Sequence, residues 1–123
     1  MPKKILIVDD EPEVLNLFEK KLKNCGYNVL ATTTGEMAIQ MAKDISPDLI
    51  ILDIRRPGID GTQVFEYLKQ DATTQHIPVL FVTAVDSPRE IIRHFELGAE
   101  NYLMKPVSPK VLLNEVEEIL VGK

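Results

Sequence analysis

The fold is decided near the start of the chain by the stretch Ile5-Leu6-Ile7-Val8-Asp9-Asp10-Glu11-Pro12. Its first half is a continuous run of branched apolar residues, which is typical of a strand buried on both faces in a parallel sheet covered by helices. Its second half places acidic residues at the carboxyl end of that strand. Pro12 then stands at a first helical position, where its missing N–H costs nothing. The stretch therefore predicts a strand, an acidic strand end and a helix in succession.

The rest of the chain repeats this alternation. Apolar runs predict five strands, over residues 4–9, 27–32, 48–53, 78–83 and 101–104. Apolar residues at helical spacing predict five helices between and after them, over residues 12–24, 35–44, 60–70, 88–97 and 109–121. Pro88 and Pro109 mark helix starts, and Gly26 and Gly98 mark left-handed helix ends. A (βα)₅ chain this short cannot close an eight-stranded barrel, so we expect an α/β fold with an open, doubly wound, five-stranded parallel sheet.

Length and composition limit the class of protein. The chain has 123 residues, which suits one domain over residues 1–123 with a core that needs no disulfide or metal. Its net charge of −5 argues against a nucleic-acid surface, because phosphate contacts need clustered lysine and arginine. The sequence has no signal-peptide pattern and no stretch of the roughly 20 apolar residues that a membrane span needs. We therefore expect a soluble, cytoplasmic protein that does not contact membranes.

Some polar residues have ordinary explanations. The single cysteine, Cys25, cannot form an internal disulfide, and we expect it to pack near the end of the first helix. His76 and His94 have no nucleophile beside them in the sequence, and we expect both at the surface. No Gly-rich phosphate-binding loop is present in the sequence.

Polar side chains also follow four of the five predicted strands. They are Asp9, Asp10 and Glu11 after the first strand, Asp53 after the third, Thr83 after the fourth and Lys105 after the fifth. A strand order of 2-1-3-4-5 would bring the acidic strand ends together at the carboxyl edge of the sheet, where ligands bind in such folds. Oxygen ligands without His or Cys suit Mg²⁺. Lys105 can pair with Asp53 or hold a phosphoryl oxygen.

Five segments carry motifs that together span nearly the whole chain: 5–12, 47–53, 57–61, 77–84 and 98–106. With these motifs the chain resembles the receiver domain of bacterial two-component response regulators, including the single-domain chemotaxis type. The resemblance implies a flavodoxin-like sheet of order 2-1-3-4-5. It also implies that the chain is not an enzyme beyond Mg²⁺-dependent self-phosphorylation and slow autodephosphorylation.

The resemblance also implies roles for individual residues. Asp53 would accept the phosphoryl group, and Thr83 and Lys105 would bind its oxygens. The metal, Mg²⁺ or Mn²⁺ in its place, would be bound by Asp10, Asp53 and the backbone carbonyl of Arg55, with Asp9 holding a metal-bound water. Tyr102 would be the switch aromatic, although the sequence alone reads it equally well as an ordinary strand residue. The partners implied are a histidine kinase or phosphotransfer protein and a downstream target or fused output domain.

The switch would act on the surface formed by residues 88–97, 101–104 and 109–121, which carries Arg89, Arg93, Tyr102 and Lys110. Thr83 would move toward the phosphoryl group, and Tyr102 would turn from an exposed to a buried position. No output domain follows Val121-Gly122-Lys123, so we expect either a protein that docks to its target or a receiver excised from a longer regulator.

Departures from the family pattern leave alternatives open. Arg56 stands where the family often has an apolar residue. Because of this departure, a pseudo-receiver, a folded interaction module that no longer accepts a phosphoryl group, stays an alternative. Arg55 and Val85 occupy positions that tune hydrolysis of the acyl phosphate, so the phosphoryl lifetime is not predicted. A haloacid-dehalogenase-like phosphohydrolase would also use an aspartyl phosphate and Mg²⁺. Its nucleophile would follow the first strand in an Asp-x-Asp motif, whereas Asp9 and Asp10 have no spacer.

Overall fold

The computed structural model describes residues 2–54, 61–84 and 88–121, in which strands and helices alternate as predicted. The elements are β1 (Lys4–Val8), α1 (Pro12–Asn24), β2 (Asn28–Thr32), α2 (Gly35–Ile45), β3 (Leu49–Leu52), α3 (Gly61–Gln70), β4 (Val79–Thr83), α4 (Pro88–Glu96), β5 (Asn101–Met104) and α5 (Pro109–Val121). No helix in the described ranges is both long and apolar enough to cross a bilayer.

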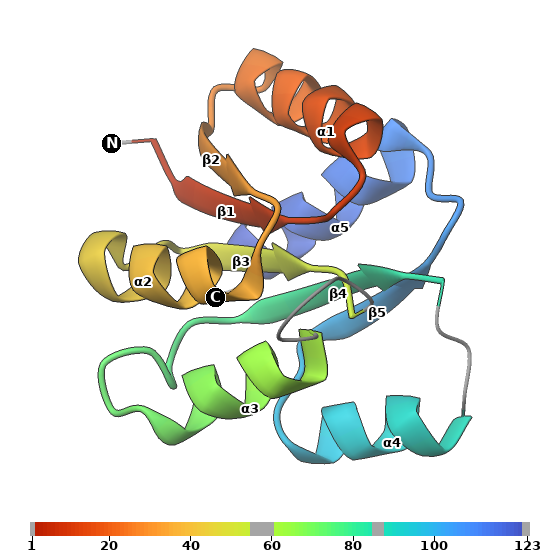
Figure 1. The fold of residues 1–123 in the computed structure, drawn as a ribbon. Helices are drawn as coiled ribbons and strands as arrows, with labels where there is room; N and C mark the ends of the chain where they lie inside the picture. The colour runs from red at the N-terminus through yellow and green to blue at the C-terminus, as the bar shows by residue number, and fades with distance from the viewer. Residues whose placement is uncertain (1, 55–60, 85–87, 122–123) are drawn as a thin grey trace.

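The five strands form one parallel sheet in the order β2-β1-β3-β4-β5 (Figure 1), which confirms the predicted order. β1 lies between β2 and β3. Its last residue, Val8, pairs with Thr32 of β2 on one side and with Leu52 of β3 on the other. The chain thus reverses its direction of winding between β1 and β3. In a doubly wound sheet this reversal opens a crevice at the carboxyl ends of the two strands.

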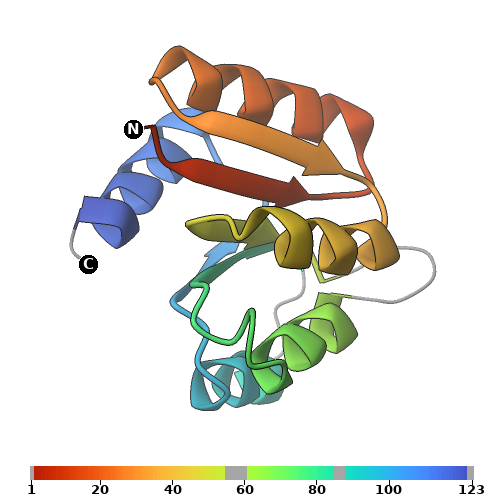
Figure 2. The same ribbon diagram turned by 90° about the vertical axis from the view of Figure 1, so that its left-hand side faces the viewer.

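Alternate residues of the central strands enter two separate cores. Ile5 and Ile7 of β1 face the core that α1 and α5 cover, whereas Leu6 and Val8 face the core beneath α2 and α3. Figure 2 shows these two helix layers on opposite faces of the sheet. Because both faces of each strand are covered, the strand sequences are continuously apolar rather than alternating. This explains why the sequence predicted a parallel sheet.

Helix boundaries follow the predicted signals closely. Pro12, Pro88 and Pro109 are the first residues of α1, α4 and α5. Gly26 and Gly98 have φ angles of 94° and 105°, the left-handed conformation that a glycine adopts at little cost after a helix.

The structure corrects two predictions about buried and exposed side chains. Cys25, expected to pack against the core, is exposed, because it caps the carboxyl end of α1 beyond Leu22, the last buried residue of that helix. His94, expected at the surface, is buried with 1% exposure because its face of α4 is turned toward the sheet. His76 is exposed, as predicted.

Candidate functional site

Three backbone hydrogen bonds hold the site residues at the carboxyl edge of the sheet. The N–H of Asp53 donates to the carbonyl of Val8 at 3.0 Å, and the N–H of Asp9 donates to that of Thr32 at 3.2 Å. At the other side of the site, the N–H of Lys105 donates to the carbonyl of Thr83 at 2.9 Å. Asp9, Asp53 and Lys105 are therefore each the first residue past a strand, and the sheet ladder itself fixes their positions. The predicted strands 4–9 and 48–53 ran one residue too far.

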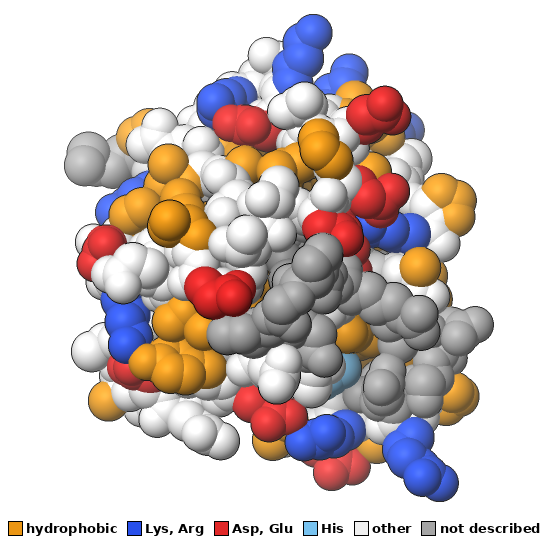
Figure 3. Space-filling model, in the orientation of Figure 1, with side chains coloured by type: hydrophobic (Ala, Val, Ile, Leu, Met, Phe, Trp, Pro, Cys, Tyr) orange, Lys and Arg blue, Asp and Glu red, His pale blue; other side chains and the backbone are white. Residues whose placement is uncertain are grey.

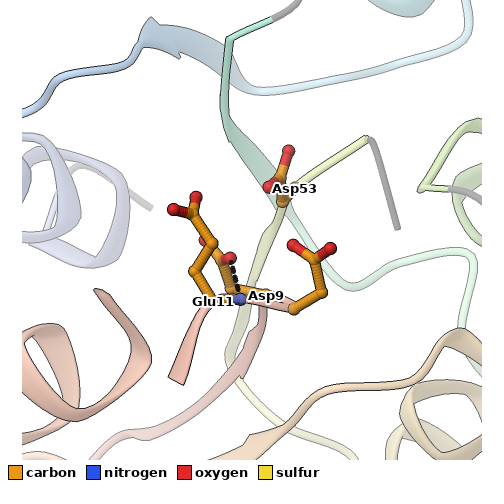
Figure 4. A group of neighbouring side chains, drawn as sticks. Asp9, Glu11 and Asp53 are labelled. Carbon is orange, nitrogen blue, oxygen red and sulfur yellow. Dashed lines mark hydrogen bonds between the residues drawn. The ribbon is translucent and has the colours of Figure 1, made fainter. Parts of the chain in front are cut away.

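Four carboxylates meet at this edge. Asp9, Asp10, Glu11 and Asp53 each offer an oxygen atom, and these atoms all lie within 4.8 Å of one another. Asp9 and Asp53 are buried, whereas Asp10 and Glu11 are exposed. Figure 4 shows Asp9 and Glu11 following β1 and Asp53 following β3, with the Glu11 N–H donating to Asp9 Oδ1 at 2.9 Å. On the molecular surface, acidic side chains gather where β1 leads into α1 (Figure 3).

The Lys105 ammonium group lies among these carboxylates. Its Nζ is 2.9 Å from Asp9 Oδ2, 2.7 Å from Glu11 Oε1 and 3.0 Å from Asp53 Oδ2. The pairing with Asp53 was predicted, but the contacts with Asp9 and Glu11 were not. Since an ammonium group has three N–H donors, the three contacts together can use all of them. The only sequence signal for the Glu11 contact was a long acidic side chain at the start of a helix facing the same crevice.

Charge and burial shift two pKa values in this cluster. Burial raises the pKa of Asp9 above its ordinary value, and the nearby Asp53 charge adds to this effect, while the Glu11 N–H and Lys105 oppose it. For Lys105, burial disfavours the charged form, but hydrogen bonds to Glu11, Asp9 and Asp53 outweigh burial and raise its pKa above the ordinary value. Lys105 is therefore a permanent positive charge at the site.

Thr83 ends β4 at this edge, and Tyr102 lies further back on the neighbouring strand β5. Thr83 is fully buried at the last position of β4, and the next residue, Ala84, is exposed. Tyr102 was expected to be exposed before phosphorylation, but its ring is half-buried against the core and its hydroxyl is buried. The reason is that β5 places Tyr102 opposite Phe81 of β4, so that the ring lies over the sheet beneath α4.

The start of α3 packs directly against the backbone at Asp53. The N–H of Gly61 donates to the carbonyl of Ile54 at 2.5 Å, and a Cβ added at Gly61 would overlap the backbone of Asp53 and Ile54. A glycine is required here by close approach of two backbones. The predicted metal ligand Arg55 and the departures Arg56 and Val85 lie outside the described residues.

The donor set fits a hard divalent cation. Every candidate ligand in the described cluster is a carboxylate oxygen, and neither His nor Cys contributes. Mg²⁺ prefers oxygen ligands and is bound through one or two carboxylates with several waters retained. The mutual repulsion of four carboxylates also favours a bound cation, since Lys105 neutralises only part of their charge.

Comparison with known proteins agrees with this geometry. A family model for the response regulator receiver domain matches residues 5–117. The chain is 39% identical over 120 residues to the alkaline phosphatase synthesis transcriptional regulatory protein PhoP of Bacillus subtilis, covering 98% of this chain but only 49% of PhoP. It is 35% identical to protein PilH of Pseudomonas aeruginosa, covering 97% of this chain and 98% of PilH. The chain thus spans about half the length of PhoP and nearly all of PilH.

A solved structure shows the same fold. The crystal structure of a CheY-like response regulator receiver domain protein from Methanospirillum hungatei superposes with a TM-score of 0.93. The two sequences are 29% identical, and the match covers 99% of this chain and 96% of the other.

Proposed function

The chain belongs to the response regulator receiver domain family of two-component signalling proteins, and from this premise we propose that Asp53 accepts a phosphoryl group from a phosphohistidine. The observation that carries the proposal is the position of Asp53. Its carboxylate is buried at the end of β3, 3.0 Å from the Lys105 ammonium group and among the three other carboxylates. We also propose that residues 1–123 form one receiver domain. The alternatives are a pseudo-receiver, which would not be labelled by a phosphoryl donor, and a phosphohydrolase, which would turn over small phosphate esters.

Phosphoryl transfer to Asp53 is an in-line substitution at phosphorus. A carboxylate oxygen of Asp53 forms the new bond to phosphorus while the bond from phosphorus to the donor imidazole nitrogen breaks. The imidazole keeps the bonding electrons and takes up a proton. Such a transfer needs positioning and charge stabilisation rather than further covalent chemistry from the protein. The family is not an enzyme family, and slow hydrolysis of the resulting acyl phosphate is the only further reaction that we propose.

Residues around Asp53 would stabilise the charge that the transfer brings in. Lys105 keeps a fixed positive charge at hydrogen-bond distance from the accepting carboxylate, and Thr83 places a hydroxyl at the end of the neighbouring strand. Asp10, Asp53 and the carbonyl of Arg55 would bind Mg²⁺, with Asp9 on a metal-bound water. The bound cation would offset negative charge on the phosphoryl oxygens.

A phosphoryl donor would reach Asp53 past the start of α1. A groove of about 350 Å³ beside Lys105 is lined mainly by apolar residues of α1 and the segment after β5, namely Glu11, Val14, Leu17, Phe18, Lys105, Pro106 and Val107. This groove supports docking of a kinase or phosphotransfer protein. We propose that the output is carried by the surface of α4, β5 and α5, with Arg89, Arg93, Tyr102 and Lys110, toward a target protein or an output domain.

The proposal is tested by incubating the protein with acetyl phosphate and Mg²⁺ and measuring its intact mass. One phosphoryl group should be added, and hydroxylamine should remove it, because hydroxylamine cleaves an acyl phosphate but not a phosphothreonine. Asp53→Asn should abolish the labelling. The matched control is Asp48→Asn, since Asp48 accepts a hydrogen bond from the Lys4 N–H at the opposite edge of the sheet. Undiminished labelling of Asp53→Asn would refute the assignment, and no labelling of the wild type would indicate a pseudo-receiver.

Metal binding is tested separately. Asp10→Asn removes one ligand charge while keeping the shape of the side chain, so the affinity for Mg²⁺ should fall, on the order of tenfold. Titration calorimetry on the unphosphorylated protein measures this directly. Equal affinities in Asp10→Asn and the wild type would show that Asp10 is not a ligand.

A further inference from the structure

An imidazole is buried on the side of α4 that faces the sheet. Among the described side chains of α4, only His94 is buried, with 1% exposure, and Ile91 is half-buried. Ile92 and Phe95, the apolar residues on either side of His94 and Arg93, are 57% and 43% exposed. A polar ring thus occupies the position that an apolar residue usually takes in an amphipathic helix. A buried polar ring at this position needs specific contacts to offset the loss of its hydration.

His94 lies at the centre of an aromatic cluster drawn from three other elements. Its ring lies 4.7 Å from that of Phe81 on β4 and 5.9 Å from that of Tyr102 on β5, with interplanar angles of 30° and 18°. Phe65 of α3 meets it edge-on at 5.9 Å. The neighbouring ring of α4, Phe95, lies 6.3 Å from Tyr102. Tyr102 therefore contacts two consecutive rings of α4, so that a movement of α4 changes the packing of Tyr102.

The same imidazole is tied to the start of α3. His94 Nε2 lies 3.1 Å from Thr62 Oγ1, a hydrogen-bond distance. Thr62 directly follows Gly61, whose backbone packs against that of Asp53 and Ile54 without room for a Cβ. The described contacts therefore run continuously from the backbone of Asp53 through Gly61, Thr62 and His94 to Tyr102.

We propose that His94 is a positioning residue that holds α4 over Tyr102 and couples both to the backbone at Asp53 through its hydrogen bond with Thr62. This connection runs through α3 and is distinct from the movement of Thr83 on β4. The coupling to phosphorylation rests on the proposed function, whereas the positioning of α4 does not.

The physical basis is a directional contact within a tightly packed cluster. Aromatic pairs tolerate small sliding movements, but a hydrogen bond weakens steeply when its distance or angle changes. A shift of the start of α3 against Asp53 moves Thr62. It therefore weakens the Thr62–His94 hydrogen bond more than it weakens the contacts between the aromatic rings. When the bond is lost, the described side chains of α4 are held by the ring contacts of His94 and Phe95 and by the half-buried Ile91, which allow α4 and Tyr102 to slide together. The exposed apolar face that carries Ile92 and Phe95 then changes position.

The positioning role is tested first, on the unphosphorylated protein without Mg²⁺. Thr62→Val removes the hydroxyl at nearly constant volume, and His94→Phe keeps an aromatic ring but removes both ring nitrogens, including the Nε2 that contacts Thr62. Both should accelerate hydrogen exchange of α4 amides, by about three- to tenfold, and shift the ring resonances of Tyr102. Thr74→Val is the matched control, because Thr74 Oγ1 donates to the Leu68 carbonyl at 2.8 Å at the far end of α3. This control should lose stability without affecting α4 selectively.

The coupling is tested by the affinity of the same variants for beryllofluoride in the presence of Mg²⁺. If the hydrogen bond belongs to the resting arrangement, its loss should tighten beryllofluoride binding by about three- to tenfold in each single variant. The double variant should show no further gain, because both substitutions remove the same bond. Thr74→Val should bind as the wild type does.

The outcomes separate the two proposals. Failure of the wild type to bind beryllofluoride would refute the proposed function and the coupling, while the exchange data would still decide the positioning of α4. Normal binding by the wild type with unchanged affinity in Thr62→Val and His94→Phe would overturn the coupling alone. Unchanged α4 exchange in both variants would overturn the positioning role.

Discussion

Replacing Lys105 by methionine tests the electrostatic balance of the site most directly. Methionine keeps a long unbranched side chain but removes the ammonium group that contacts Asp9, Glu11 and Asp53 at 2.7–3.0 Å. The variant therefore leaves the four clustered carboxylates without this cation. We expect Lys105→Met to be much less stable than the wild type in the absence of Mg²⁺ and to recover stability when Mg²⁺ is added.

The size of the effect follows from the burial of each partner. Asp9 and Asp53 have side chains that are 5% and 7% exposed, and removing one partner from a buried ion pair costs about 3–5 kcal/mol. Glu11 is 58% exposed, so its contact contributes at most about 1 kcal/mol. Because the crevice is open to solvent at Glu11, the lower end applies. We expect the free energy of unfolding to fall by about 3 kcal/mol.

Magnesium should bind more tightly to the variant because the ammonium group no longer competes for the same oxygens. A tenfold gain in affinity corresponds to about 1.4 kcal/mol, and at saturation this difference adds to the stability of the folded state. Mg²⁺ should thus recover about half of the lost stability, beyond the increase that it produces in the wild type.

The assay is urea denaturation followed by circular dichroism, with and without saturating Mg²⁺. Lys43→Met is the control, since Lys43 Nζ pairs with Asp71 on the surface at 3.5 Å, and its loss should cost less than about 1 kcal/mol with no dependence on Mg²⁺. Wild-type stability of Lys105→Met without Mg²⁺, or the same increment from Mg²⁺ in both proteins, would refute the reasoning.

Further predictions concern neighbouring residues. Burial raises the folded-state pKa of Asp9 above its unfolded value of 3.8, so its ionisation disfavours folding: the penalty is absent below the unfolded pKa and complete above the raised one. Asp9→Asn should therefore stabilise the metal-free protein at neutral pH. Denaturation at a series of pH values should show that the difference in unfolding free energy between variant and wild type shrinks as the pH falls. A difference that does not change with pH would contradict a raised pKa of Asp9. Gly61→Ala should cost about 3 kcal/mol or more in thermal unfolding, because the added Cβ overlaps backbone atoms that cannot rotate away. A loss below about 1 kcal/mol would show that α3 shifts freely. Thr83→Val should keep the fold and still be labelled by acetyl phosphate, but beryllofluoride should no longer change the NMR resonances of Tyr102; a wild-type response would exclude a role of the Thr83 hydroxyl in the switch.

The sequence by itself determined the parallel sheet and the members of the acidic cluster, whereas the order of the strands was implied by the resemblance to receiver domains. Strand runs such as Ile5–Val8 are apolar at every position only because both faces are covered, so the local pattern carries information about the layers above and below. Proline at helix starts and glycine at helix ends act through backbone geometry within a few residues, which is why the boundaries agreed closely. Given parallel strands and the order 2-1-3-4-5, the acidic strand ends had to meet.

Only the tertiary structure decided which face of a short helix is buried and which side chains share a donor. On α4 the apolar Ile92 and Phe95 are exposed while His94 is buried, because three rings and Thr62 from other elements surround that one position. Likewise, the contact between Lys105 and Glu11 joins residues 94 apart in sequence, and no local pattern encodes it. Periodicity reports polarity along one segment, whereas burial and ion pairing depend on what the other segments place against it.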